Sequence, residues 1–218
     1  FMCKRPLSNN EYYPTFNRPN VKLLDVSETQ GVELLTEKGF MHNGTEYEVD
    51  CIIFASGFEV TSDLDRRWGI KKVEGRNGIS IYDHWRDGPV TLHGTMTHGF
   101  PNQFYVGYIQ GATNSTVTVQ FGEQGRHIAH IIAETMKRGG KVVEPTREAM
   151  DAYVQRFREL EPPSDFIDQC TPSYFNNEGE KDARWALFRA WGLGWYNFDQ
   201  MLKDWRANGA MEGLQVTS

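Results

Sequence analysis

Two stretches of small residues follow apolar runs and could bring backbone N–H groups to a ligand. After the apolar run 104–109 come seven small or polar residues, 110–116, and then a helical pattern begins. Strand, small-residue loop and helix is the arrangement that sets N–H groups and a helix N-terminus beside a ligand. The second stretch, Ala55-Ser56-Gly57-Phe58, would let the backbone approach a cofactor at the carboxyl edge of a sheet. Many α/β units without a ligand share both patterns, so a core strand followed by a turn is the alternative.

The side chains that could carry charge or bind metal are few and scattered. Lys4 and Arg5 form a basic pair beside Pro6, and such a pair is by default exposed to solvent. His127 and His130 lie three residues apart on a predicted helix, but no further ligand cluster supports zinc. We therefore expect no metal, and we expect these histidines to be core or solvated residues. No complete GxGxxG occurs, so the sequence has no recognisable phosphate-binding turn.

The composition favours an acidic globular protein with a sizeable core. The chain has 218 residues, a net charge of −6, a pI near 5.5 and 13% aromatic residues. An acidic balance without a basic stripe argues against a nucleic-acid partner, and no apolar run approaches the length of a membrane span. Cys3, Cys51 and Cys170 are scattered, which fits a reducing cytoplasm better than a disulfide framework. The expected location is therefore cytoplasmic, with neither nucleic acid nor membrane as a partner.

The first half of the chain has the pattern of strands. A hairpin over 40–47 is predicted to turn at Asn43-Gly44, a dipeptide that favours a tight two-residue turn. The continuous apolar run 51–55 is typical of a strand covered on both faces. One helical turn is expected at 82–85. The predicted strands cover residues 21–26, 31–36, 51–55, 90–96 and 104–109.

The second half has the pattern of helices. A helix is predicted over 114–138, ended by Gly139-Gly140, with an apolar face of Val117, Phe121, Ile128, Ile132 and Met136. A second helix runs from after Pro145 to about Leu160, with Met150, Val154 and Phe157 on one face. A third, aromatic-rich segment covers 181–205, is interrupted at the Gly-Leu-Gly of 192–194, and is interpreted as core packing. The long irregular connection before it is more often functional than accidental.

Four longer motifs occur along the chain in a fixed order. They read CKRPL with EYYPTFNRPNVKLLDV, then VDCIIFASGFEV, GFPNQFYVGY and CTPSYFNNEGE. In order and separation they resemble the C-terminal part of a type I Baeyer–Villiger monooxygenase, over essentially the whole chain. The aromatic tail and CTPSYFNNEG are more similar to the branch acting on large cyclic and steroid-like ketones. Family members are much longer and carry two glycine-rich dinucleotide motifs and an FxGxxxHxxxW-type fingerprint upstream, and none of these is in this sequence.

This resemblance implies an α/β fold, strand-rich in the first half and helical in the second. The chain would be the C-terminal part of a flavoprotein with two Rossmann-like dinucleotide-binding domains. Residues 1–20 would end the NADP-binding domain and linker, 21–140 would complete the FAD-binding domain, and 141–218 would form a helical region with a mobile loop. The chain would then require the upstream part of the same enzyme and be inactive without it.

The implied reaction inserts one oxygen atom of O₂ into a ketone to give an ester or lactone, with FAD and NADPH as cofactors. NADPH reduces the flavin, which takes up O₂ to form a peroxyflavin that attacks the ketone carbonyl. A peroxide anion needs a fixed positive charge beside it, and arginine suits this better than lysine. By motif match, Arg5 is this catalytic residue and Lys4 is the partner of the 2′-phosphate of NADP.

The remaining site residues follow from the same match. Tyr174 falls roughly where small-ring enzymes have a tryptophan in a mobile loop over NADP and substrate, and Ser56 stands where threonine is common. The loop 110–118 would line flavin and substrate. The residues expected to bind cofactor are Lys4, Ala55, Ser56, Gly57, Phe58, Gly99, Phe100, Pro101, Asn102, Thr118 and Tyr174, and those expected to bind substrate are Gly111, Ala112, Thr113 and Asn114.

Two other functions remain open at this point. Another flavin monooxygenase of the same architecture would oxygenate nitrogen or sulfur, although Lys4-Arg5 and the CTPSYFNNEG loop speak against it. A non-catalytic binding or assembly module is the alternative if the 218 residues are a complete chain. Such a chain would be colourless, because it lacks both glycine motifs.

Overall fold

The computed structural model describes residues 7–29, 31–57, 65, 68–160, 169–173, 176, 179 and 190–218. The chain divides into two compact units, Phe1–Glu59 and Val60–Ser218. This division concerns compactness alone, so the three regions expected from the sequence, 1–20, 21–140 and 141–218, stay a prediction.

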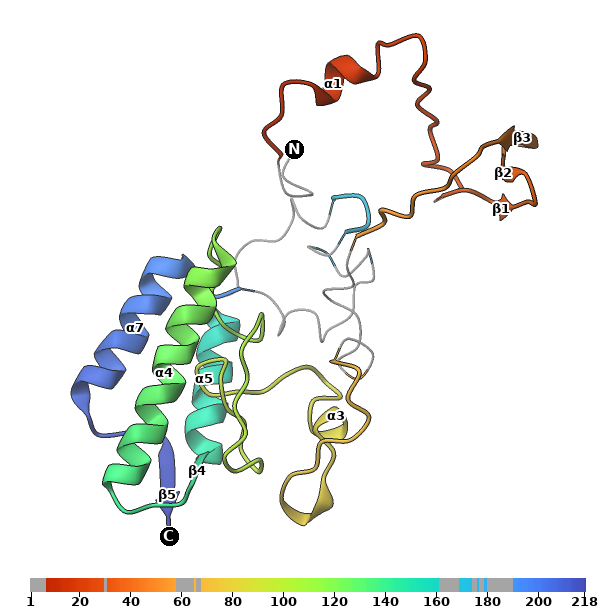
Figure 1. Cartoon of the computed structure of the whole chain (residues 1–218). Coiled ribbons are helices and arrows are strands. Elements are labelled where there is room, and N and C mark those ends of the chain that lie inside the picture. Colours follow the sequence, from red (N-terminus) through yellow and green to blue (C-terminus); the bar gives the residue numbers. More distant parts are fainter. Residues whose placement is uncertain are drawn as a thin grey trace. The chain divides into compact units, whose positions relative to one another are not determined.

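The first unit contains a small antiparallel sheet, drawn in orange in Figure 1. β1 (Leu34–Leu35) pairs with β2 (Gly39–His42), and β2 pairs with β3 (Thr45–Glu48). The predicted hairpin is confirmed, because Asn43 and Gly44 have φ angles of 48° and 70°, as a primed two-residue turn requires. A single helical turn, α1 (Tyr12–Thr15), precedes the sheet.

Two strands predicted in this unit are not formed. Residues 21–26 are irregular, and residues 51–55, predicted to be covered on both faces, are exposed and unpaired. Ile53 and Phe54 are 84% and 75% exposed. A strand of this apolar composition needs neighbours on its edges and faces, and the described part of the unit supplies none. The run therefore presents apolar side chains to solvent.

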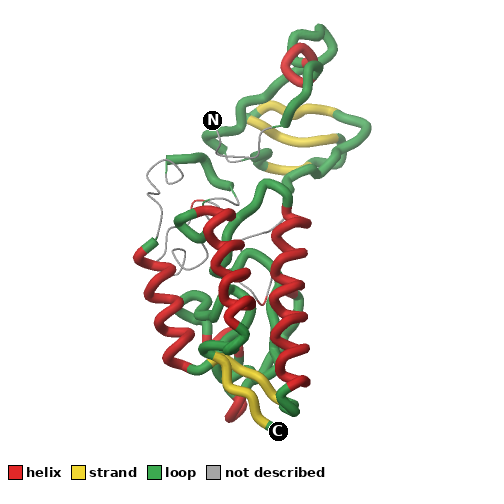
Figure 2. Tube along the Cα trace, turned by 90° about the vertical axis from the view of Figure 1, so that its left-hand side faces the viewer, coloured by secondary structure: helices red, strands yellow, loops and turns green. Residues whose placement is uncertain are grey.

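The second unit holds three long helices side by side, α4 (Val117–Lys137), α5 (Arg147–Glu159) and α7 (Gly194–Asn208) (Figures 1 and 2). The short elements η1 (Arg76–Gly78) and α3 (Ile81–His84) precede them, and α3 confirms the predicted helical turn. An antiparallel pair, β4 (Val142–Pro145) with β5 (Leu214–Thr217), lies at one end of the helices. This strand pair was not predicted.

The helix ends follow from their sequences. α4 closes with Gly139 at a φ of 73°, while Gly139 N–H donates to Met136 O and Gly140 N–H donates to Thr135 O, each at 2.9 Å. This pair of hydrogen bonds is the Schellman motif, so the predicted end of the helix at Gly139-Gly140 is confirmed. α5 begins at Thr146, whose hydroxyl oxygen accepts from Ala149 N–H at 3.1 Å.

α5 and α7 pack their apolar faces together. α5 buries Met150, Val154 and Phe157 as predicted, together with Tyr153. Phe198 and Leu202 of α7 are fully buried and share one core cluster with Trp191, Tyr153, Phe157, Leu92 and Ala112. The aromatic stripe of the third helical segment is thus confirmed as core packing over 191–202, and the part over 181–189 lies outside the described residues.

α4 buries a mainly polar face, and the predicted apolar positions are half-buried or exposed. Ile132 and Met136 of the predicted face are 41% and 71% exposed. The periodicity identified the helix correctly, but the neighbours of its buried side are loop peptide groups, an imidazole and an arginine, which polar side chains satisfy better than apolar ones. The buried residues are Gln120, Glu123, Gln124, His127, Ile131 and Thr135.

The two remaining predicted strands, 90–96 and 104–109, do not form, and only isolated backbone hydrogen bonds occur in their place. Leu92 N–H donates to Met96 O at 2.8 Å across a tight turn, and Tyr105 N–H donates to Thr95 O at 2.8 Å. Gly107 and Gln110 have φ angles of 155° and 46°, and the second of these breaks an extended chain. Both segments still reach the core, so their apolar character reflects burial without sheet pairing.

Candidate functional site

The loop 107–116, which leads into α4, has a buried inner part and an open outer part. Gly111 and Ala112 are buried, and Gly111 O accepts from Trp191 N–H at 3.0 Å. Thr113 is exposed and Asn114 is half-buried. Of the four residues expected to bind substrate, the structure therefore places the first two in the core and leaves the last two accessible.

Two glutamine side chains of α4 hold this loop from inside. Gln124 Oε1 accepts from Gly107 N–H at 3.1 Å, and Gln124 Nε2 donates to Gly107 O at 3.0 Å. Gln120 Nε2 donates to the same Gly107 O at 3.3 Å, and Gln120 Oε1 accepts from Asn114 N–H at 3.3 Å. Both side chains are 1% exposed. Nothing in the hydrophobic pattern of the sequence pointed to these residues.

Gln110 is held in the same way from two other elements. Its backbone oxygen accepts from the Tyr153 hydroxyl at 2.6 Å, and its Oε1 accepts from the Thr91 hydroxyl at 2.7 Å. Gln110 is fully buried, and its Nε2 has no hydrogen-bond partner among the residues that the structure describes. Burial raises the pKa of Tyr153 well above its usual value, so this hydroxyl stays protonated and donating.

The N-terminus of α4 is open. Thr116 makes no side-chain capping bond, and the first turn contains no acidic residue. Asn114 Oδ1 accepts from Thr116 N–H at 2.8 Å, which orders the entry without covering the helix amides. Thr118, expected to contact cofactor, is exposed in this first turn. A 21-residue helix of this kind favours an acceptor or negative charge at its N-terminus.

The turn 99–102 lies at the other end of α4 and is tied to β4. Asn102 N–H donates to Val143 O at 2.9 Å, Asn102 Oδ1 accepts from Val143 N–H at 2.9 Å, and Asn102 Nδ2 donates to Lys141 O at 3.0 Å. Phe100 is 2% exposed in a core cluster with Ile81, Trp85, Tyr105 and Ile109. Gly99 and Pro101 are half-buried beside it. A helix of this length spans about 30 Å, so the structure does not bring this turn together with Thr113 and Asn114.

The other predicted site residues lie in the first unit or outside the residues that the structure describes. Ala55, Ser56 and Gly57 are exposed, and Gly57 has a φ of 94° with open space around its Cα. Lys4, Arg5, Phe58 and Tyr174 lie outside the described residues. In the segment 169–179, Asn176 is described: its Oδ1 accepts from Ser173 N–H at 2.9 Å and its Nδ2 donates to Cys170 O at 3.0 Å. The expected mobility of this loop stays a prediction.

A pair of buried histidines lies in the core beside α4. His93 Nδ1 and His127 Nε2 are 3.1 Å apart, and the rings of Trp205 and Tyr153 pack edge-on against them. Burial lowers the pKa of His93 to about 4. Burial, with His93 and Arg206 nearby, lowers the pKa of His127 to about 2. Both imidazoles are therefore neutral, and His127 is a core residue.

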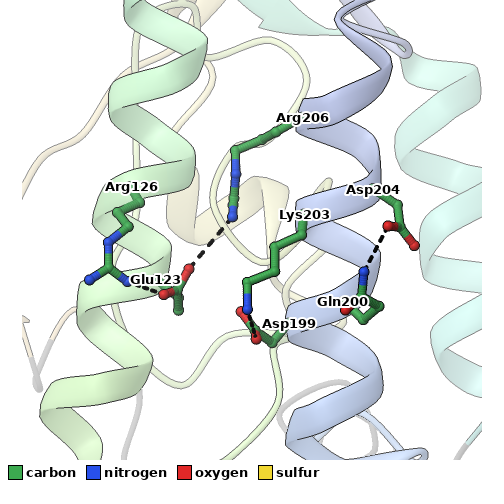
Figure 3. Close-up of polar contacts among 7 residues, drawn as sticks. All are labelled: Glu123, Arg126, Asp199, Gln200, Lys203, Asp204 and Arg206. Carbon is green, nitrogen blue, oxygen red and sulfur yellow. Dashed lines mark hydrogen bonds and ion pairs between the residues drawn. The ribbon is translucent and has the colours of Figure 1, made fainter.

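Charged side chains join α4 to α7 (Figure 3). Glu123 on α4 contacts Arg126 of its own helix, and its Oε2 lies 3.6 Å from Arg206 Nη2 on α7. Along α7, Lys203 Nζ donates to Asp199 Oδ2 at 2.6 Å and Gln200 donates to Asp204. The hydrogen bond with Asp199 raises the pKa of Lys203. The contact between Glu123 and Arg206 joins the two helices, whereas the other pairs lie within one helix.

A shallow apolar groove of about 470 Å³ lies beside Asn102. Ile132 and Met136 of α4 line this groove, so the groove includes part of the predicted apolar face of the helix. Its other lining residues are Phe104, Thr135, Gly140, Lys141 and Val143.

The described part of the chain bears on metal binding, on membrane spans and on the state of the cysteines. No group of three or more His, Cys, Asp or Glu among these residues could hold a metal ion. None of the described helices combines the length and apolarity needed to cross a bilayer. Cys51 is a free, exposed thiol, whereas Cys170 is disulfide-bonded, which corrects the expectation that the cysteines stay reduced.

Comparison with known proteins identifies relatives along nearly the whole chain. It is 40% identical over 217 residues to pentalenolactone D synthase of Streptomyces arenae, which covers 98% of this chain and 36% of that protein. It is 38% identical to a Baeyer–Villiger monooxygenase of Stachybotrys chlorohalonatus, covering 98% of this chain and 34% of the relative. The chain thus spans about a third of the length of the relatives it matches. No model of a known protein family matches it.

Solved structures agree. The chain superposes with a TM-score of 0.89 on a polycyclic ketone monooxygenase from Thermothelomyces thermophila, at 30% identity and over 99% of this chain and 35% of that one. An open structure of cyclohexanone monooxygenase matches with a TM-score of 0.74 at 26% identity, over 99% and 37% of the two chains. The α/β character expected from the sequence is therefore confirmed.

Proposed function

We propose, because this chain is homologous to Baeyer–Villiger monooxygenases over about a third of their length, that it forms the flavin- and ketone-facing part of such an enzyme. The observation that carries the proposal is the loop 107–116 with the open N-terminus of α4 behind it. The loop is rigidly held inside and accessible outside, as a wall of a binding pocket must be. Lys4 and Arg5 complete the assignment by motif match.

The residues present fit one part of FAD. The uncapped first turn of α4 offers N–H groups to an acceptor, and the exposed backbone at Ala55–Gly57 leaves room for close approach. The sequence has no GxGxxG, so the phosphate groups need residues of a longer polypeptide. We therefore assign the chain to the part of the enzyme that completes two Rossmann-like dinucleotide-binding domains.

The overall reaction converts a ketone, O₂, NADPH and a proton into an ester or lactone, NADP⁺ and water. FAD, when bound, supplies the redox chemistry by accepting hydride from NADPH and activating O₂. The chain's own residues position and stabilise: Arg5 holds a fixed positive charge beside the negative charge that develops during oxygen transfer, and Lys4 binds the 2′-phosphate of NADP. Thr113 and Asn114 face the ketone.

The proposed substrate is a cyclic ketone larger than cyclohexanone. The TM-score is 0.89 with the polycyclic ketone enzyme and 0.72–0.80 with structures of cyclohexanone monooxygenase. The steroid-like resemblance of the CTPSYFNNEG loop points the same way. We expect a higher kcat/KM for a fused-ring ketone than for cyclohexanone.

The experiment is product analysis with the complete FAD-loaded protein, NADPH and O₂, offered a fused-ring ketone in one reaction and a thioether in another. Ester or lactone formed in proportion to NADPH supports the proposal. Efficient sulfoxide with no ester would instead assign the protein to another class of flavin monooxygenase, and failure to oxidise NADPH with either substrate would contradict both.

A further inference from the structure

The buried face of α4 contains two glutamines whose side-chain polar atoms all hydrogen-bond the loop 107–116. Gln120 and Gln124 are each 1% exposed, and they lie one turn apart on the same face of the helix. Burying a carboxamide is costly unless its donor and its acceptor are both satisfied. Here each of the four side-chain atoms has a partner, and each partner is a backbone group of the loop.

The pattern of bonds fixes two points of the loop. Gln124 hydrogen-bonds both the N–H and the C=O of Gly107, at 3.1 Å and 3.0 Å, as a neighbouring strand would. Gln120 reaches both points, donating to Gly107 O and accepting from Asn114 N–H, each at 3.3 Å. The six residues between these points are thereby held against one turn of the helix.

The loop needs such a clamp because its backbone is otherwise irregular. Gly107 and Gln110 have φ angles of 155° and 46°, and the second is unfavourable for a residue with a Cβ. The loop belongs to no sheet, so strand pairing does not support it. Thr113, which is exposed, adjoins Asn114, whose backbone N–H is held by Gln120.

We infer that Gln120 and Gln124 are positioning residues, which hold the loop 107–116 so that Thr113 and Asn114 present a defined surface to the ketone. The inference rests on the proposed function, and it adds the residues that set the shape of the ketone pocket from behind. Neither glutamine touches the ketone, so neither is a catalytic residue.

The test uses the complete FAD-loaded protein with the single variants Gln120→Met and Gln124→Met. Hydrogen exchange is read by mass spectrometry on peptides covering 105–109 and 112–117. Gln124→Met frees Gly107 N–H, so exchange at 105–109 should rise about tenfold; Gln120→Met frees Asn114 N–H, so exchange at 112–117 should rise about tenfold. Gln155→Met is the matched control, because the Gln155 side chain is exposed on α5 and donates to Glu159 of the same helix.

The kinetic arm separates positioning from mere stability. Both variants should raise the KM for a fused-ring ketone about fivefold or more and change the ratio of lactone isomers. Gln120→Glu keeps an oxygen acceptor for Asn114 N–H, and it should restore most of the protection at 112–117 and most of the parent's KM.

Unchanged exchange at both peptides would overturn the inference, as would increased exchange with the parent's KM and isomer ratio. A Gln120→Glu variant that behaves like Gln120→Met in both arms would also overturn it. Failure of the proposed function is recognised separately, because then the unsubstituted protein makes no ester at all.

Discussion

At the scale of single residues, the sharpest consequence of the proposed function concerns the basic pair. Arg5→Ala should spare flavin reduction and impair oxygen transfer, because the developing negative charge loses its fixed partner. Removing one such group commonly costs about 2.7–4 kcal/mol at a transition state, or roughly a hundredfold or more in rate. Lys4→Ala should instead weaken NADPH relative to NADH and leave oxygen transfer possible. Stopped-flow absorbance and ester formed per NADPH consumed measure both effects.

The alternative for this pair is two solvated side chains. In that case either substitution shifts the kinetics little. If a variant lacking Arg5 still makes ester at the parent's rate and with the same yield per NADPH, the catalytic role of Arg5 is contradicted.

The buried histidine pair predicts an acid-sensitive fold. His93 and His127 have folded-state pKa values of about 4 and about 2, both lowered by burial. Their unfolded pKa is about 6.5. The stability that they contribute is therefore present above about pH 6.5 and declines as the pH falls below it, because the unfolded state binds protons that the folded state excludes.

At pH 5.5 this loss should reach about 1.4 kcal/mol per histidine relative to pH 7.5. His130 and Arg206 lie close to the pair, and the positive charge of Arg206 also disfavours its protonation. Urea unfolding at the two pH values measures the slope. The double variant His93→Gln/His127→Gln should flatten it, and an equally steep slope in that variant would contradict the explanation.

At the scale of elements, Asn102 docks β4 onto the turn before the site. Its side chain makes one hydrogen bond to the backbone of β4 at Val143 and one to Lys141 just before the strand, and its φ of 56° is a conformation that alanine disfavours. Asn102→Ala should lower the free energy of unfolding by about 2–3 kcal/mol. Asn102→Gly, which removes the bonds but accepts the φ angle, should lose less.

Denaturant unfolding with and without added FAD checks this prediction. A purely structural tie gives the same difference between variant and parent under both conditions. A difference that appears only with FAD would favour the cofactor role expected from the sequence, and would contradict the structural role.

The helices were predictable from the sequence, and most of the strands were not. Gly139-Gly140, Thr146 and the apolar positions of α5 act locally, so the spacing of residues determines helix ends and faces there. The run 51–55 reads as a buried strand, yet it has no pairing partner in the described structure. Strand formation depends on distant neighbours that a local pattern does not contain.

The candidate site could be predicted only in part, for a related reason. The small residues of 110–116 marked the loop correctly, because a sharp backbone path requires them. Gln120 and Gln124 carry no such mark, since a glutamine on a helix is by default a surface residue. Their role follows from the peptide groups that they contact, and these come from a segment 6 to 17 residues earlier in the chain.

At the scale of the whole molecule, the exposed apolar surfaces bear on the extent of the protein. Ile53 and Phe54 in the first unit and Met136 in the second are 75–84% and 71% exposed. Under the proposed function, these side chains are covered by further polypeptide, corresponding to the part of the relatives that this chain does not match. The 218-residue chain alone should therefore be colourless and bind FAD weakly, because it lacks a phosphate-binding glycine turn.

Absorbance of the purified chain mixed with FAD and then desalted measures this directly. A retained, normal flavin spectrum would contradict the proposal that the cofactor site needs a longer polypeptide. Addition of FAD to the complete protein is the positive control.

The polar interior around α4 has a thermal consequence. Among the described residues, fourteen polar or charged side chains are buried beside eighteen apolar ones. Exposing polar surface on unfolding lowers the heat capacity, whereas exposing apolar surface raises it. Calorimetry should therefore give a heat-capacity change below the usual 12–15 cal/mol/K per residue, that is, less than about 12; a value at or above that range would contradict the expectation. A small heat-capacity change flattens the curve of stability against temperature, so warming or cooling away from the optimum should weaken this protein only gradually.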